Sequence, residues 1–279
     1  MTRRQATAYE RFQWFRHRRS PADPGLTVGY VYALSGDLSV DRLDGALRDT
    51  LTTAFPRLLS SFTEVGDSLW VRSRSAPERV LHRCERKEAL LDSGGIDPAG
   101  PDLYRFRYWQ ESPEFLLLRL DFSHLVFDGS SYAPFCAALG AHWRGESPVL
   151  ERAVAAGGRP EPADDEAFWR ARLDGRRLHQ PLPFRSPAAA GHDGRGLAVK
   201  ETLSGGRAAR IHRFLREHEV SLLQFVVAVT GALVHAYGHE DDGQGVVVAH
   251  TVDTRPYGAP YGCHTNLLPL WLDVSSDRS

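Results

Sequence analysis

The sequence predicts an α/β fold built as a two-layer lobe. An apolar run from Phe115 to Phe122 is long enough for one buried strand, and the segment after its loop has helical periodicity. Residues 29–35 also read as a strand, and a turn and a second helical pattern follow them. With 42% hydrophobic and 25% charged residues, the 279-residue chain is globular and can bury a sizeable core.

Composition and charge argue against several classes of protein. A formal net charge of −1 gives no indication of a nucleic-acid or anionic-membrane partner. Cys84, Cys136 and Cys263 are far apart and form no C-x-x-C pair, so neither a zinc site nor a disulfide framework is expected. The N-terminus lacks the apolar segment of a signal peptide, and no long apolar run follows. We therefore expect a cytoplasmic protein that binds no metal.

The first elements of the chain follow from periodicity and turn residues. Residues 7–18 are amphipathic, which predicts a surface helix that packs Phe12 and Phe15. After the strand at 29–35, Ser39 is placed to cap a helix. The apolar face of that helix consists of Leu43, Ala46, Leu47 and Leu51. A strand followed by a one-sided helix is the unit from which a two-layer lobe is built.

Three further strands are expected, at 69–72, 103–110 and 115–122. Residues 111–114 form a turn that joins the last two. Within 103–110 the aromatic residues alternate, so they share one face of the strand. These residues are Tyr104, Phe106 and Tyr108. Such a stripe is far more often part of a core than a platform for a ligand.

The loop after the 115–122 strand carries the side chains that could take part in a reaction. His124 is followed by three apolar residues, Asp128 and Gly129, and Ser130 or Ser131 is placed to cap the next helix. A histidine with an ordinary pKa of about 6.5 can accept a proton at neutral pH. Loops that leave a strand for a helix often present catalytic groups in α/β folds. The pattern alone is equally compatible with a core histidine before an ordinary Asp-Gly turn.

The second half of the chain is less regular. Residues 147–163 are rich in Pro, Gly and Ala and mark a candidate boundary between lobes. Residues 211–219 and 221–237 predict two helices, and the second is apolar almost all round, which predicts that it is buried. An apolar strand is expected at 245–251.

The His124 loop resembles the H-H-x-x-x-D-G motif of nonribosomal peptide synthetase condensation domains, which belong to a superfamily that resembles chloramphenicol acetyltransferase. The matched residues are His124, Asp128 and Gly129, with Ser131 at a frequent serine position, whereas Ser123 replaces the first histidine. A later stretch resembles the motifs G-x-P-x-x-x-R and I-G-x-F-x-N-x-L-P-L of the same domains. Its matched positions are Arg255, Gly262, Asn266, Leu268, Pro269 and Leu270.

The resemblance implies a domain organisation. Residues 1–160 would form the N-terminal condensation lobe, which carries the S-H-x-x-x-D-G variant of the motif. Residues 161–279 would form only the opening part of a second, similar lobe. The fold expected from the resemblance is therefore a two-layer lobe like that of chloramphenicol acetyltransferase plus a partial second lobe.

The resemblance also implies roles for single residues. His124 would be the catalytic residue. The positions implied to support the motif structurally are Ser123, Asp128, Gly129 and Arg255. Asp128 and Arg255 are expected to form a salt bridge, because a buried carboxylate needs a partner. The candidates for the lining of the substrate tunnel are Ser130, Ser131 and Asn266.

The implied reaction is acyl transfer between carrier-protein thioesters in the biosynthesis of a peptide antibiotic or another secondary metabolite. The implied partners are a donor and an acceptor peptidyl carrier protein, or an acyl carrier protein, and they supply the phosphopantetheine arms. No cofactor of the chain's own is implied. Two other functions stay open: a free-standing acyltransferase that uses CoA or a carrier thioester and an alcohol, and a degenerate domain that docks carrier proteins without turnover.

Three competing sites are less favoured by the sequence. A hydrolase triad would need Ser130 or Ser131 beside His124 and Asp128, but the chain has no G-x-S-x-G elbow. A second cluster has metal-binding residue types that a solvated helix end explains more simply. Its members are His235, His239, Asp241 and Asp242. Cys263 and His264 are adjacent, so on a strand they would face opposite ways, which favours a packing role for the cysteine.

Overall fold

The computed structural model describes residues 3–20, 23–92, 94–148, 162–176, 199–238, 245–253 and 262–274. The chain divides into two compact units, and each unit is discontinuous in sequence. The first consists of Met1–Ala156 and Asp253–Thr265, and the second of Gly157–Val252 and Asn266–Ser279. The expected lobe boundary at 160/161 assigned 253–265 to the second lobe, whereas this segment groups with the first unit.

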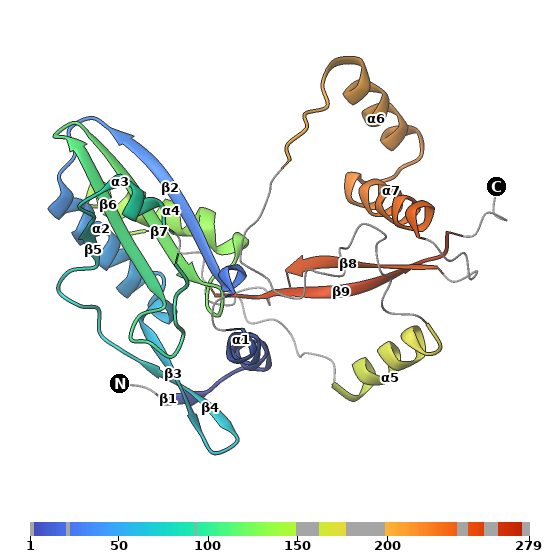
Figure 1. Cartoon of the computed structure of the whole chain (residues 1–279), viewed down its shortest axis with the longest axis horizontal. Coiled ribbons are helices and arrows are strands. Elements are labelled where there is room, and N and C mark those ends of the chain that lie inside the picture. The colour runs from blue at the N-terminus through green and yellow to red at the C-terminus, as the bar shows by residue number, and fades with distance from the viewer. Residues whose placement is uncertain are drawn as a thin grey trace. The chain divides into compact units, whose positions relative to one another are not determined.

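The first unit contains a four-stranded sheet in the order β2-β7-β6-β5 (Figure 1). Its strands are β2 (Thr27–Ser35), β5 (Leu81–Arg83), β6 (Tyr104–Ser112) and β7 (Phe115–Ser123). β7 runs antiparallel to both of its neighbours, and β5 runs parallel to β6. A smaller sheet has the order β1-β4-β3, from β1 (Arg3–Gln5), β4 (Ser68–Ser73) and β3 (Ser60–Val65). The predicted 115–122 strand is thus an internal strand of the main sheet.

Alternation along the strands determines which face of the main sheet is apolar. In register, Tyr104 lies opposite Phe122 and Phe106 opposite Leu120, so the aromatic stripe of β6 meets the apolar stripe of β7. Helices α2 (Val40–Thr53) and α4 (Gly129–Arg144) bury their apolar faces in the same core cluster. The α/β two-layer prediction is therefore confirmed, as is the assignment of the aromatic stripe to the core.

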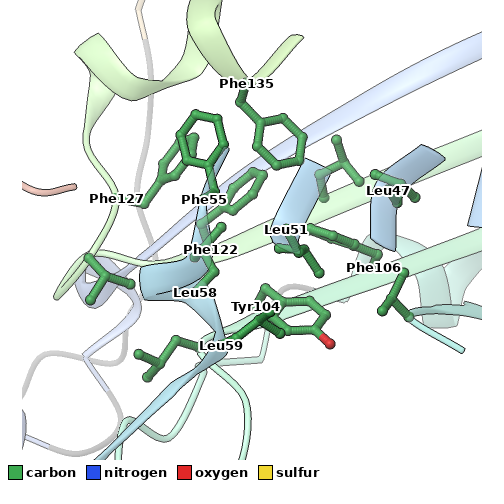
Figure 2. Close-up of a cluster of buried hydrophobic side chains, with 14 of the residues drawn as sticks. Leu47, Leu51, Phe55, Leu58, Leu59, Tyr104, Phe106, Phe122, Phe127 and Phe135 are labelled. Atoms are coloured by element: carbon green, nitrogen blue, oxygen red, sulfur yellow. The ribbon is translucent and has the colours of Figure 1, made fainter. Parts of the chain in front are cut away.

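Aromatic rings fill the core next to the His124 loop, and Figure 2 shows this cluster. The ring of Phe122 stacks on that of Phe127 with centroids 4.0 Å apart, and it meets Phe135 edge-on at 4.9 Å. Phe55 contacts Phe135 at 5.2 Å in the same cluster. Because Phe122 lies one residue before the end of β7, Phe127 lies in the loop and Phe135 belongs to α4, this packing fixes the path of the chain around His124.

The opposite face of the main sheet is charged but still partly buried. Asp121 of β7 is fully buried and forms ion pairs with Arg119 at 2.8 Å, Arg107 at 3.2 Å and Arg105 at 3.3 Å. These arginines also donate to main-chain carbonyls of the segment that contains α3 (Lys87–Leu91). Asp121 thus holds the arginines that link that segment to the sheet.

Helix α1 (Ala8–Arg19) forms as predicted but buries a different face. Phe12 and Phe15 are 56% and 57% exposed, so the prediction that they pack was wrong. The buried stripe consists of Glu10, Gln13, Trp14 and His17. Its spacing is helical, and its polar members have partners, which is why a pattern based on apolar residues alone missed it.

The second unit contains three helices among its described residues. They are α5 (Pro162–Leu173), α6 (Gly205–Glu217) and α7 (Leu222–Tyr237). The strands β8 (Val246–Asp253) and β9 (Thr265–Leu272) pair as a two-stranded sheet. The prediction that 221–237 is a buried helix was wrong, because Gly231 is the one residue of α7 that is buried.

In the part of the chain that the structure describes, none of the helices taken singly is long and apolar enough to span a bilayer. The pair α6 and α7 meets the length and composition criteria when the two are taken together, although they are bent by 106° relative to each other.

Candidate active site

His124 lies in the turn that directly follows the internal strand β7. Its main-chain N–H donates to the carbonyl of Leu26 at 2.8 Å, and the N–H of Ser123 donates to the carbonyl of Leu103 at 2.8 Å. The next three residues are buried, whereas His124 itself is only partly buried. The prediction of a histidine in the loop that leaves a central strand is therefore confirmed.

Asp128 is the residue that caps helix α4. Its Oδ1 accepts a hydrogen bond from the main-chain N–H of Ser131 at 2.9 Å and another from the Ser131 hydroxyl at 2.8 Å. The expectation that Ser130 or Ser131 caps the helix was wrong, because the helix begins at Gly129. A carboxylate at this position is favoured by the partial positive charge at a helix N-terminus. Asp128 is fully buried and has a structural role.

The same carboxylate attaches the segment 262–265 to the His124 loop. Oδ2 of Asp128 accepts from the main-chain N–H of His264 at 2.8 Å and lies 3.5 Å from the hydroxyl of Thr265. The Ser131 hydroxyl also bonds the carbonyl of Gly262 at 3.1 Å. These contacts explain physically why Asp253–Thr265 belongs to the first unit despite its late position in the sequence.

The remaining motif residues differ in burial and in the unit to which they belong. Ser123 is buried, and its hydroxyl accepts from the N–H of Leu125 at 3.4 Å. Gly129 and Ser130 are exposed in the first turn of α4. Asn266 lies exposed in β9 of the second unit. Arg255 falls outside the described residues, so its salt bridge with Asp128 stays a prediction.

A contact that the sequence did not indicate involves Cys263. Its sulfur lies 3.4 Å from Nδ1 of His124 and 2.9 Å from the hydroxyl of Tyr9 in α1. The expectation that Cys263 has only a packing role assumed a strand, but Cys263 precedes β9 and points its sulfur at the imidazole. Burial is the main cause that raises the pKa of Tyr9, so its hydroxyl stays protonated at neutral pH. A signal that could have indicated this contact is the cysteine's position inside a recognisable motif.

The competing sites do not take the geometry they would need. A triad requires a histidine between the serine and the aspartate, whereas the hydroxyl of Ser131 bonds Asp128 directly. No group of three potential metal-ligating side chains occurs within the described ranges. The proposed cluster around His235 falls mostly outside those ranges, because His239, Asp241 and Asp242 are not described.

An apolar pocket of about 460 Å³ lies away from the His124 loop in the first unit. It is formed by β2, β7, α2 and α4 near Tyr32, Leu118 and Trp143. In β2, Thr27 pairs with Ser123 beside His124, so Tyr32 lies five residues further along, roughly 17 Å at strand spacing. The candidate tunnel residues Ser130, Ser131 and Asn266 are not part of its lining.

Replacement of Ser131 by alanine tests the joint between α4 and 262–265. The change removes the hydroxyl whose single proton Oδ1 of Asp128 and the carbonyl of Gly262 share, whereas Oδ1 keeps its hydrogen bond from the main-chain N–H of residue 131. We expect a loss of about 1–3 kcal/mol in the free energy of unfolding, measured by urea titration. Ser130→Ala is the matched control: it removes an exposed hydroxyl from the same turn and should change stability by less than about 0.5 kcal/mol. Equal stability of the two variants would contradict this account of the joint.

Comparison with solved structures identifies the fold. The X-domain from teicoplanin biosynthesis matches 98% of this chain with a TM-score of 0.79 and 20% identity. The first condensation domain of the CDA synthetase matches 100% of it with a TM-score of 0.72 and 21% identity. The starter condensation domain of rhizomide synthetase matches 98% of it, with a TM-score of 0.67 and 18% identity. The chain therefore has the condensation-domain fold.

The chain matches only part of the length of each solved domain. The chain spans 66% of the X-domain and of its counterpart in the complex with OxyB, 67% of the rhizomide domain and 72% of the CDA domain. No protein-family model matches the sequence, and no curated protein matches it significantly. The likeness therefore concerns the fold, within which the predicted motif residues have the positions described above.

Proposed function

We propose that this protein is a condensation-type acyltransferase that forms an amide bond between a carrier-bound acyl thioester and an acceptor amine. The observation that supports the proposal most directly is the position of His124: it follows the internal strand of a condensation-type sheet, is partly exposed and is held by main-chain contacts. A general base needs this combination of access and fixed orientation. The proposed partners are a donor and an acceptor carrier protein, each with a phosphopantetheine arm.

In the proposed reaction, Nε2 of His124 accepts a proton as the acceptor amine attacks the thioester carbonyl. The tetrahedral intermediate then collapses, the C–S bond breaks, and the departing thiolate takes up the proton. The oxyanion of the intermediate requires nearby donors, and the first N–H groups of a helix are suited to this task. Helix α4 begins at Gly129, five residues after His124, with Asp128 as its cap. The proposal therefore assigns oxyanion stabilisation to the first turn of α4.

A second candidate function is supported by one of the structural neighbours. The X-domain from teicoplanin biosynthesis was solved in complex with OxyB, and it matches this chain at 23% identity with a TM-score of 0.78. The same fold thus forms a docking surface for another protein in that pathway. The second candidate is a module that binds a partner protein without turnover.

One assay separates the candidates. The 279-residue chain is incubated with an acyl-loaded donor carrier and an acceptor carrier loaded with an amino acid, and mass spectrometry of the arms detects the amide. A parallel reaction with an alcohol acceptor detects ester formation. Amide formation above a protein-free blank supports the first candidate, whereas ester formation alone supports the O-acyltransferase. Absence of both products, together with carrier binding in a calorimetric titration, would replace the proposal by the docking module.

A further inference from the structure

We propose that Cys263 is a positioning residue that holds His124 in the tautomer with hydrogen on Nδ1, so that Nε2 keeps its lone pair. The inference extends the proposed function by naming a residue on which the base depends. Its structural part, the tautomer, can be tested without any turnover. Cys263 is only 6% exposed, so water competes little for its contacts with His124 and Tyr9.

In the proposed network, the thiol of Cys263 is a donor to the hydroxyl oxygen of Tyr9, which also accepts from Gln13. Arg16 has only donors, and one of them bonds Oε1 of Gln13 at 3.2 Å. The Nε2 group of Gln13 therefore faces Tyr9 and donates to its hydroxyl oxygen. The same oxygen accepts from the thiol of Cys263 at 2.9 Å. The sulfur has then used its proton, and only its lone pairs are left for Nδ1 of His124.

A sulfur that has no proton to give must accept from Nδ1. The separation of 3.4 Å suits an N–H donor and a sulfur acceptor. Each ring nitrogen of a neutral imidazole has one role, so hydrogen on Nδ1 makes Nε2 the acceptor. Burial is the main cause that raises the pKa of Tyr9, so its phenol keeps its proton at neutral pH. The buried carboxylate of Asp128 contributes to that shift through its charge.

The consequence for the reaction is that Nε2 of His124 can accept a proton as soon as the substrate binds. If Nδ1 had no acceptor, the imidazole would populate both tautomers, and the form with hydrogen on Nε2 cannot take a proton at that nitrogen. A positioned partner on the rear nitrogen is a recurrent way to fix a reacting histidine, although the partner is usually a carboxylate or a carbonyl. Here the structure assigns that task to a thiol, supported through Tyr9 and Gln13 from α1.

The direct test is a ¹⁵N spectrum of the imidazoles in the 279-residue chain at about pH 8, where an unperturbed histidine is neutral. The chain has 12 histidines, so the signal of His124 is identified by its loss in His124→Gln. In the wild-type chain we expect the pattern of an imidazole protonated on Nδ1. A pattern with hydrogen on Nε2 would overturn the proposal without any variant.

Three cysteine variants then test the cause. Cys263→Ala removes the acceptor, and the His124 signal should shift toward a mixture of tautomers. Cys263→Ser keeps an acceptor and a donor and should retain the wild-type pattern. Cys84→Ala makes the same chemical change at a half-buried thiol outside the site and should have no effect on His124. If Cys263→Ala does not fold, Tyr9→Phe serves instead, because it frees the thiol proton to turn toward Nδ1. An unchanged tautomer in the folded Cys263→Ala or Tyr9→Phe variant would overturn the proposal.

The kinetic part rests on the proposed function. In the amide-forming assay, Cys263→Ala should lower kcat by about 10- to 100-fold, the usual worth of a group that orients a reacting histidine, while KM changes little. Cys263→Ser should recover most of the loss, which a purely packing role of the sulfur would not produce. If the wild-type chain shows the Nδ1–H pattern but no turnover, the proposed function fails and the positioning role stands.

Discussion

Replacement of His124 by alanine should lower the rate of amide formation by about 10²- to 10⁴-fold, which is the usual contribution of a general acid–base group. The physical reason is that His124 provides the imidazole of the loop, whereas the carboxylate of Asp128 in the same motif caps α4. The measurement is the initial rate with loaded donor and acceptor carrier proteins at saturating concentrations.

Ser123→Ala is the matched control for this variant. Ser123 is adjacent to His124, and its hydroxyl accepts one long hydrogen bond from the N–H of Leu125. It can at most support the loop, so its removal should cost far less in rate. Both variants must give the unfolding curve of a folded protein, since a displaced loop would mimic a chemical defect. Unchanged turnover in a folded His124→Ala protein would make the alignment of the two carrier arms the main source of rate, and the histidine would not be catalytic.

The sequence predicts the local part of this site well, because strand, loop and helix are contiguous there. The apolar run ends one residue before β7 does, His124 follows in a turn, and α4 starts at Gly129. The cap was assigned to the wrong residue because Asp128, Ser130 and Ser131 all favour that position. Propensity alone does not separate three capping residue types within four positions, whereas the hydrogen bond to the N–H of Ser131 does.

Contacts between distant segments were outside the reach of sequence patterns. Cys263 lies 139 residues beyond His124, and Tyr9 lies 254 residues before Cys263. A hydrophobic pattern reports which face of an element is apolar but carries no information on its partner. The same limit explains α7, whose apolar composition predicted burial although much of the helix is exposed. The prediction that Asp128 pairs with Arg255 depends on such a contact too, and it remains to be tested.

The charged face of the main sheet is a further feature that the sequence pattern did not predict. The run from Phe115 to Phe122 was read as a mostly apolar strand, yet Arg119 and Asp121 are both buried in it. They alternate with the core residues of β7 and therefore face the other side of the sheet. Gly29 of β2 makes room for them, because a Cβ at that position would lie 2.6 Å from Oδ1 of Asp121. Such a pair is recognisable only once the register of β2 and β7 is known.

Removal of the Asp121 carboxylate should therefore be the most destabilising of the substitutions considered. Asp121→Ala leaves three guanidinium groups beside one another without their shared counter-charge, and that of Arg119 is almost completely buried. Loss of one partner from a buried ion pair costs about 3–5 kcal/mol, because the remaining charge is left without compensation. We expect a loss of this size in the free energy of unfolding, measured by urea titration, and loosening of the segment around α3.

The matched control removes a carboxylate from an exposed ion pair. Asp41 bonds Arg79 at 2.8 Å, but its side chain is 84% exposed. Asp41→Ala should therefore cost less than about 1 kcal/mol, since water and salt screen that interaction. Hydrogen exchange gives a second measurement. In Asp121→Ala, main-chain amides around α3 should exchange faster before those in the core of β6 and β7 do. The reason is that Arg107 and Arg119 hold the α3 segment through its carbonyls. Similar losses for the two variants would mean that the three arginines lie close enough to solvent to need no buried counter-charge.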